Sequence, residues 1–263
     1  KATRVRARIV AQTINEQMQA SDKVFIMGHD NEDYDAIGSA IGMAKLSLSL
    51  NKETYIVLSG RNDNVNRISE MLARESIKVN DHEEDYNSIM VEEAEALKHI
   101  TPNSLLVLVD HHREILTASK SVLEAIPKRI IVDHHRRSED LLADTVLLYL
   151  EPSSSSTSEL LTELVGYFND RLEFTPVEAT ALYSGIVLDT KNFAVQTGER
   201  TFEAAALLRR NGADSNMVRL MFKDDMDVLK LRARLLADAK VLENGIAIAL
   251  YKKAEKGAKA TIL

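Results

Sequence analysis

Short apolar runs alternate along the chain with longer segments whose apolar residues recur at helical spacing. A continuous apolar run is typical of a strand buried on both faces of a parallel sheet. Such runs lie at 24–27, 53–59, 105–109, 129–133 and 145–150, with a shorter one at 89–91. The intervening segments predict helices at 2–20, 36–50, 64–74, 92–100, 153–168, 176–190, 199–212 and 228–243. This alternation predicts an α/β fold with a mainly parallel sheet flanked by helices.

Two local expectations concern surfaces. We expect the first helix to bury one face that carries Val5, Ile9, Val10 and Ile14. We expect the acidic run 81–85, together with His82 and His99, to be solvated loop and surface.

The charge balance excludes a general surface for long nucleic acids. The 263 residues contain 33 Lys and Arg against 40 Asp and Glu, a net charge of −7, whereas such a surface is basic. Cysteine is absent, so the chain has no disulfide framework and no cysteine nucleophile. No apolar run reaches roughly 18 residues, so we expect no membrane contact from this chain.

A burst of polar ligand-type residues follows the first apolar run. It contains His29, Asp30, Asn31, Glu32, Asp33 and Asp35. Ligands in open α/β sheets bind beyond the carboxyl ends of the strands, and carboxylates crowded there repel by about 3 kcal/mol per pair. Divalent cations such as manganese, magnesium or iron would relieve that repulsion. The alternative is a solvated loop whose aspartates cap the next helix.

An apolar run followed by ligand-type residues recurs at two later strand ends. One run ends in Asp110, His111 and His112, and another ends in Asp133, His134 and His135. Asp189 ends a predicted buried helix, where negative charge is disfavoured without a compensating partner. Together these three features favour a metal centre over the capped-loop alternative.

The serine run 153–156 allows two interpretations. It caps the following helix, through Ser155 with Ser158 or Ser156 with Glu159. Alternatively, hydroxyls and amides at the helix start contact phosphate, in which case Ser155 and Ser156 bind the ligand.

Four motifs in order carry a resemblance to a known family. They are GHDNEDYDAIG at 28–38, LLVLVDHH at 105–112, IIVDHHRR at 130–137 and GIVLDTKNF at 185–193. The set resembles the DHH phosphoesterase family with its attached DHHA1-type subdomain, over about residues 20–220. The segments EPSSSSTSELLTEL and LYSGIVLDTKNFAVQTGERTFEAAALLRRNGAD look most like bacterial cyclic-di-AMP phosphodiesterases of the GdpP (YybT) type.

The resemblance implies a ligand set. His29 and Asp33 would hold one metal ion, Asp35, His134 and Asp189 the other, and Asp110 would bridge both. It also implies supporting roles: His135 would face the phosphate as the catalytic histidine, and Asp133 would orient an imidazole from behind the ligands. His112 would also lie behind the ligands, without a defined role, and Arg136 is a further candidate phosphate contact. His111 stands where relatives often carry a small or hydroxyl residue, and it receives no role.

The implied activity is hydrolysis of cyclic di-AMP to linear pApA by a hydroxide bridging two Mn²⁺ ions, with Mg²⁺ or another divalent metal as substitute. One alternative is a short-oligonucleotide nuclease with 3′,5′-bisphosphate nucleotide phosphatase activity. Another is a nucleotide-binding regulatory module without turnover. The expected partner is a cyclic dinucleotide, and a homodimer is a candidate assembly.

The resemblance also suggests how the chain is divided. We expect a catalytic DHH domain at 1–212, a helical linker at 213–243 and the start of a truncated DHHA1-type subdomain at 244–263. The family's glycine-rich stretch ending in His has no counterpart before Leu263, so we expect a metal centre that lacks part of its substrate site. We expect a cytoplasmic domain whose full-length parent is anchored in the bacterial membrane.

Overall fold

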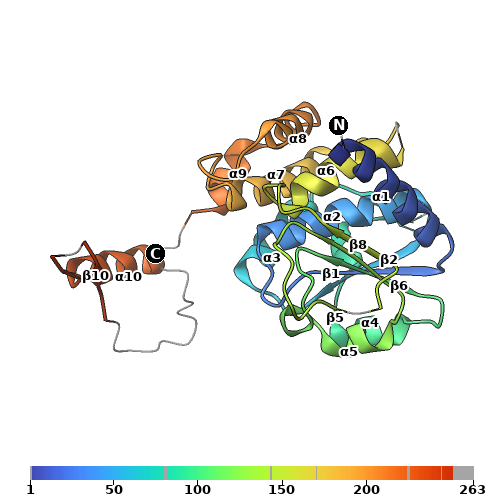
Figure 1. Ribbon diagram of the computed structural model, residues 1–263, viewed down its shortest axis with the longest axis horizontal. Coiled ribbons are helices and arrows are strands. Elements are labelled where there is room, and N and C mark those ends of the chain that lie inside the picture. Colours follow the sequence, from blue (N-terminus) through green and yellow to red (C-terminus); the bar gives the residue numbers. More distant parts are fainter. Residues whose placement is uncertain are drawn as a thin grey trace. The chain divides into compact units, whose positions relative to one another are not determined.

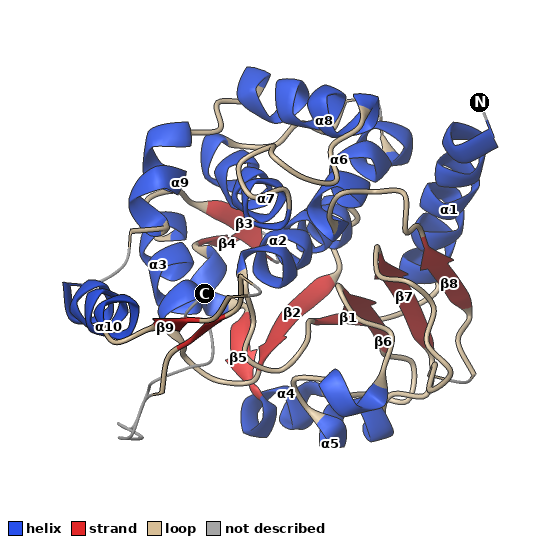
Figure 2. Ribbon diagram, turned by 60° about the vertical axis from the view of Figure 1, so that its left-hand side comes forward, coloured by secondary structure: helices blue, strands red, loops and turns tan. Residues whose placement is uncertain are grey.

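The apolar runs form one six-stranded sheet in the computed structural model (Figure 1). The strand order is β5-β2-β1-β6-β7-β8 (Figure 2). Every pairing in this sheet is parallel, and Val24 of β1, for example, lies between Thr54 of β2 and Leu105 of β6. The strands are β1 (Lys23–Met27), β2 (Glu53–Leu58), β5 (Met90–Glu92), β6 (Leu105–Val109), β7 (Arg129–Asp133) and β8 (Leu147–Leu150). The predicted α/β fold with a mainly parallel sheet is therefore confirmed.

The structure describes residues 2–79, 82–142, 144–169, 171–223, 226–243 and 245–250. The chain divides into two compact units, Lys1–Val218 and Arg219–Leu263, and the large sheet belongs to the first. The division falls inside the segment 213–243 that the sequence predicts as a linker. The assignment of the parts to catalytic and substrate domains stays a prediction.

Helices cover both faces of the sheet. In the first unit they are α1 (Ala2–Gln19), α2 (Tyr34–Ser49), α3 (Asp63–Leu72), α4 (Glu93–His99), α5 (Lys120–Ala125), α6 (Thr157–Phe168), α7 (Pro176–Asp189) and α8 (Glu199–Arg210). Figure 2 shows α4 and α5 on one face, and α2, α6 and α7 on the other. Under α4 and α5 the core is closed by Phe25, Met27 and Leu106, which are fully buried.

The strand order reverses between β1 and β6. From β1 the chain moves outward to β2 and β5, then returns to the other side of β1 as β6. The connections that leave β1 and β6 run to opposite faces of the sheet, through α2 and α5 respectively (Figure 2). Such a reversal opens a crevice beyond the carboxyl ends of the two strands, which is the usual ligand site of open α/β sheets.

The predicted buried face of α1 is partly wrong. Val10 and Ile14 are buried as expected, but Val5 and Ile9 are each 60% exposed. The buried stripe of α1 instead continues through Ala7, Ala11 and Met18. The two alanines let α1 approach α6 closely, and this tertiary packing outweighs the larger apolar residues on the neighbouring stripe.

Several short elements were not predicted from the hydrophobic pattern. An antiparallel pair, β3 (Ile77–Val79) and β4 (His82–Glu84), includes part of the acidic run expected as loop. Its residues 82–84 are exposed as expected, and residue 81 lies outside the described residues. His99 is half-buried and stacks on Tyr55. The helix α5 and the single turns η1 (Tyr86–Ser88) and η2 (Glu114–Leu116) were not predicted.

Four further described elements lie at or beyond the division between the units: α9 (Ser215–Met221), α10 (Met226–Ala237), β9 (Lys240–Val241) and β10 (Ala247–Ile248), and the two strands pair antiparallel. The helix predicted at 228–243 is confirmed as far as Ala237, but its last residues are wrong, because Lys240–Val241 form β9. Among the described helices, none has the length and apolar character needed to cross a bilayer.

Candidate metal centre

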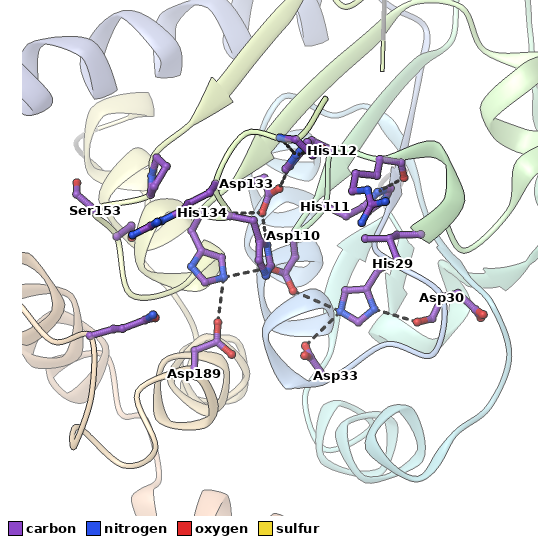
Figure 3. A pocket seen from close by; sticks show the side chains of 18 of the residues that line it. His29, Asp30, Asp33, Asp110, His111, His112, Asp133, His134, Ser153 and Asp189 are labelled. Carbon is purple, nitrogen blue, oxygen red and sulfur yellow. Dashed lines mark hydrogen bonds and ion pairs between the residues drawn. The ribbon is translucent and has the colours of Figure 1, made fainter. Parts of the chain in front are cut away.

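The predicted ligands converge from four segments on the crevice beside β1 and β6, and Figure 3 labels all of them except Asp35. His29 follows β1, while Asp33 caps α2 and Asp35 lies in its first turn. Asp110 and His134 directly follow β6 and β7, and Asp189 is the last residue of α7.

Among the described residues, three groups place ligand atoms within 4.8 Å of one another. They are His29 with Asp33 and Asp110; Asp35 with His134 and Asp189; and Asp110 with His134 and His135. The first two groups have the composition expected from the sequence. Because Asp110 reaches His29 through Oδ2 (3.5 Å) and His134 through Oδ1 (3.5 Å), it lies between them.

The ring of His29 is oriented by its own loop. Its Nδ1 donates to the carbonyl oxygen of Asp30 (2.9 Å), so Nε2 is the nitrogen that carries the lone pair once the ring is neutral. That nitrogen lies 3.6 Å from Asp33 Oδ1 and 3.5 Å from Asp110 Oδ2. A hydrogen bond that fixes the tautomer and turns the free nitrogen toward carboxylates is the usual arrangement of a metal-binding histidine.

Nε2 of His134 is the clearest indication of a cation. It lies 3.1 Å from Asp189 Oδ2, 3.5 Å from Asp110 Oδ1 and 3.9 Å from Asp35 Oδ2. It is buried, and although it lies within ion-pair distance of these oxygens, it makes no hydrogen bond of good geometry among the described residues. A buried polar atom left without a partner costs free energy, and an ion held by these oxygens and this nitrogen would remove the cost. The donor set of imidazole and carboxylate suits manganese, iron or magnesium.

Asp35 has no exposed surface and is held by the start of α6. The backbone N–H of Thr157 donates to its Oδ2 (2.7 Å), and that of Ser158 donates to its Oδ1 (2.8 Å). A helix N-terminus favours negative charge, so the carboxylate stays in one orientation. On the other side lies Gly185 of α7, where a Cβ would come within 2.6 Å of Asp35 Oδ1.

Asp110 adopts a backbone conformation that is unusual for aspartate. Its φ is 63°, in the left-handed region, which costs a non-glycine residue roughly 1–2 kcal/mol. The Thr157 hydroxyl donates to its Oδ1 (3.1 Å). Strain of this kind concentrates at functional sites, where the surroundings hold it in place.

Asp133 joins two histidines. The backbone N–H of Ser138 donates to Nε2 of His112 (3.1 Å), so the other nitrogen, Nδ1, carries the proton and donates to Asp133 Oδ2 (2.6 Å). Nδ1 of His135 donates to Asp133 Oδ1 (2.7 Å). Asp133 therefore orients the rings of His112 and His135, and its supporting role at a metal centre stays a prediction.

The charges of the site are adjusted by burial and by one another. Burial, together with Asp110 and Asp189, raises the pKa of Asp35 well above its ordinary value, and burial also raises the pKa of Asp110. Burial opposes charge on the histidines as well, but neighbouring carboxylates prevail. They raise the pKa of His29 to about 11 and the pKa of His134 to about 10. When no metal ion is bound, protons on these imidazoles and carboxyl groups therefore offset the repulsion between the carboxylates.

The pocket around the groups has a volume of about 1250 Å³. Arg136 lines it, and its role as a phosphate contact stays a prediction. Ser155 and Ser156 are fully buried: the Ser155 hydroxyl donates to Glu159 (2.5 Å), and the Ser156 oxygen caps α6 by accepting from the Glu159 N–H (3.0 Å). The capping interpretation through Ser156 and Glu159 is confirmed, and the serines that line the pocket are their neighbours Ser153 and Ser154.

His111 also lines the pocket, although no role was predicted for it. Burial lowers its pKa to about 4, so the ring is neutral, and Nδ1 contacts the carbonyl oxygen of Arg113 (3.2 Å). The backbone N–H groups of Thr157 and Ser158 were missed because an amide leaves no signature in the side-chain sequence. The serine run only marked a helix start there.

Residues 23–186 match the model of the DHH family, N-terminal domain. The chain belongs to the DHH family. All four segments that form the metal groups lie in or directly after the matched part of the DHH domain.

The chain is also similar to individual DHH and related proteins. It is 40% identical over 249 residues, 95% of its length, to cyclic-di-AMP phosphodiesterase PdeA of Listeria monocytogenes, and it spans 37% of that relative. It is 25% identical over 237 residues to the probable bifunctional oligoribonuclease and PAP phosphatase NrnA of Streptococcus mutans, covering 89% of this chain and 68% of that relative. The crystal structure of an exopolyphosphatase-related protein from Bacteroides fragilis shares the fold, with a TM-score of 0.69, 20% identity and coverage of 89% and 66%.

Metal binding should release protons. The raised pKa values of His29 and His134, about 11 and about 10, keep both rings protonated at neutral pH without metal. An imidazole must lose its proton to coordinate a metal, so the apparent affinity for Mn²⁺ should rise from about pH 6 to about pH 9. Calorimetry in buffers with different ionisation enthalpies measures the proton release directly. An affinity independent of pH would contradict this assignment.

Replacing Gly185 should weaken metal binding through Asp35. In Gly185→Ala the new methyl group would collide with Ser158 Oγ and Asp35 Oδ1, so we expect Mn²⁺ affinity to fall by about 10–100-fold. Gly166→Ala is the matched control, because this glycine of α6 has open space around the position of a Cβ. The control should keep wild-type affinity, and equal affinity of the two variants would show that the contact is unimportant.

Proposed function

We propose that the chain is a two-metal phosphodiesterase that opens cyclic di-AMP to linear pApA. The observation that carries the proposal is the position of Asp110, whose two oxygens face two separate imidazole–carboxylate groups. His29 and Asp33 would hold one ion, Asp35, His134 and Asp189 the other, and Asp110 would bridge them. When bound, two such ions supply Lewis acidity that lowers the pKa of an attacking water and neutralises charge on the phosphoryl oxygens.

The side chains around the groups would bind and orient the phosphodiester. Hydrogen bonding to Asp133 raises the pKa of His135, which favours the charged ring. With its Nδ1 engaged by Asp133, the ring has Nε2 left to meet a phosphoryl oxygen. Arg136 adds a second cation to the same pocket. These groups would stabilise the charge that develops during in-line displacement.

The substrate class rests on the relatives. PdeA is named for cyclic di-AMP, and the pocket of about 1250 Å³ is large enough for a dinucleotide. Manganese is our preferred metal because the donor set mixes imidazole with carboxylate. The same resemblance leads us to propose a cytoplasmic domain within a membrane-anchored parent protein, with a homodimer as a candidate assembly.

A second function is favoured by one relative. NrnA is named as an oligoribonuclease and PAP phosphatase, and the chain covers 68% of it. The same metal groups would serve cleavage of linear pApA or removal of a phosphate from a 3′,5′-bisphosphate nucleotide. A third alternative, a regulatory module, would keep the site for binding without turnover.

Product analysis tests the proposal. Cyclic di-AMP, linear pApA and 3′-phosphoadenosine 5′-phosphate are each incubated with the protein and Mn²⁺, or with chelator, and separated by chromatography. We expect manganese-dependent conversion of cyclic di-AMP to pApA. Asp110→Asn, which keeps the shape but weakens the bridge, should lower the rate at least about a hundredfold.

Asp63→Asn is the matched control for charge, because Asp63 is exposed in the first turn of α3 and should keep the wild-type rate. Cleavage of only the linear or bisphosphate substrates would favour the second function. Binding of cyclic di-AMP without any cleavage would favour the regulatory module. A wild-type rate in Asp110→Asn would exclude the two-metal mechanism.

A further inference from the structure

One wall of the metal pocket is apolar. Ile115 and Leu116, both in η2, line the pocket and are 78% and 41% exposed. The rest of the described lining consists mainly of histidine, aspartate, serine and arginine, with Pro152 as a further apolar residue. Large apolar side chains left in water at the edge of a polar site mark a surface that an apolar part of a ligand covers.

This wall is attached directly to a metal-ligand segment. The backbone N–H of Asp30 donates to the carbonyl oxygen of Leu116 (2.6 Å), and His29 forms a β-bridge with Thr117. The N–H of Ala118 donates to Gly28 (3.2 Å). The position of η2 is thereby tied to that of His29.

The other end of the wall is fixed as well. The N–H of Leu116 donates to the carbonyl oxygen of Arg113 (3.2 Å), and the Arg113 side chain donates to Asp140 through Nε (2.7 Å). Arg113 also forms a β-bridge with Leu141. Because its backbone is hydrogen-bonded on both sides, the wall is formed before a ligand arrives. Ligand binding therefore loses little conformational entropy in ordering it.

We propose that Ile115 and Leu116 form the subsite for a nucleobase of the substrate, beside the metal groups that take its phosphate. The inference rests on the proposed function for the identity of the ligand. A nucleotide places a charged phosphate and a flat apolar base on opposite sides of a ribose. The pocket offers the same pair of surfaces, a cluster of metal-ligand side chains at His29 and an apolar wall one β-bridge away.

The aliphatic character of the wall also limits how well it can distinguish one nucleobase from another. Aliphatic side chains contact the face of a ring and offer no hydrogen bonds to its edge, and contact with the face is tolerant of base identity. Ile115 and Leu116 therefore add affinity for a purine in general. Any discrimination between adenine and guanine comes from other groups.

Binding of AMP and ribose 5-phosphate isolates the contribution of the base, because the sugar phosphate lacks only the adenine. Both ligands are titrated by calorimetry into the full chain with Mn²⁺. Burying two apolar side chains predicts that AMP binds at least about tenfold more tightly than ribose 5-phosphate. In Ile115→Ser/Leu116→Ser this ratio should fall below about threefold, while affinity for ribose 5-phosphate and Mn²⁺ stays unchanged.

Two variants make the test specific. Ile9→Ser removes a comparably exposed isoleucine of α1, outside the pocket lining, and should keep the wild-type ratio. Ile115→Phe offers a larger flat surface and should keep or increase it. A wild-type ratio near one, or an unchanged ratio in the double variant, would overturn the subsite.

This measurement is separate from the test of the activity. Neither ligand is cyclic di-AMP, and neither has to be cleaved. Failure to open cyclic di-AMP with a normal AMP ratio would overturn the proposed function and leave the base subsite supported. Turnover of cyclic di-AMP without tighter binding of AMP than of ribose 5-phosphate would support the proposed function and overturn the base subsite.

Discussion

The buried carboxylate of Asp35 sets the arrangement of the site. An ionised group without exposed surface is costly unless donors surround it, and here two backbone N–H groups of α6 hold both oxygens. This requirement brings the start of α6 against the first turn of α2. The helix α7 packs close to the same turn: a Cβ at Gly38 would lie 2.5 Å from the Ala181 carbonyl oxygen, and one at Gly185 would strike Asp35 itself. Asp189, at the end of α7, reaches His134 because α7 packs at that distance.

Protons and cations are alternatives in this site. The carboxylates of Asp35 and Asp110 are buried within reach of His134. Their mutual repulsion raises the affinity of the whole cluster for positive charge, whether that charge is a proton on an imidazole or a divalent ion. The hydrogen bonds that orient His29 and Asp133 do not depend on which of the two is present, because they run to groups outside the cluster. The donors are thus positioned before an ion arrives.

The sequence predicted the strands and the convergence of ligands because both have local signals. A buried parallel strand reads as an apolar run, and ligand-type residues at its carboxyl end, such as Asp110 and His134, meet at one edge of the sheet. Asp189 ends a helix, where its charge indicated that it needs a compensating partner, but its assignment to one ion together with Asp35 and His134 depended on the family resemblance. The exposure of Val5 and Ile9 could not be predicted from the sequence, because two adjacent stripes of α1 are both apolar. Which stripe is buried is decided by the packing of α1 on α6. Whether a serine hydroxyl faces the pocket or caps a helix is likewise decided by the turn before α6.

The donors that gather at the crevice are widely spaced along the chain. They come from residue 29 to residue 189, and the strands that carry them become neighbours only when β6 inserts beside β1. No two-motif fragment brings both groups together, in contrast to metal sites built from one short loop. During synthesis, which proceeds from the N-terminus, a growing chain holds His29 and Asp33 long before it holds Asp189. The proposed ions would therefore gain their full set of ligands late in synthesis, after β1, β6 and β7 have become neighbours and the end of α7 is in place.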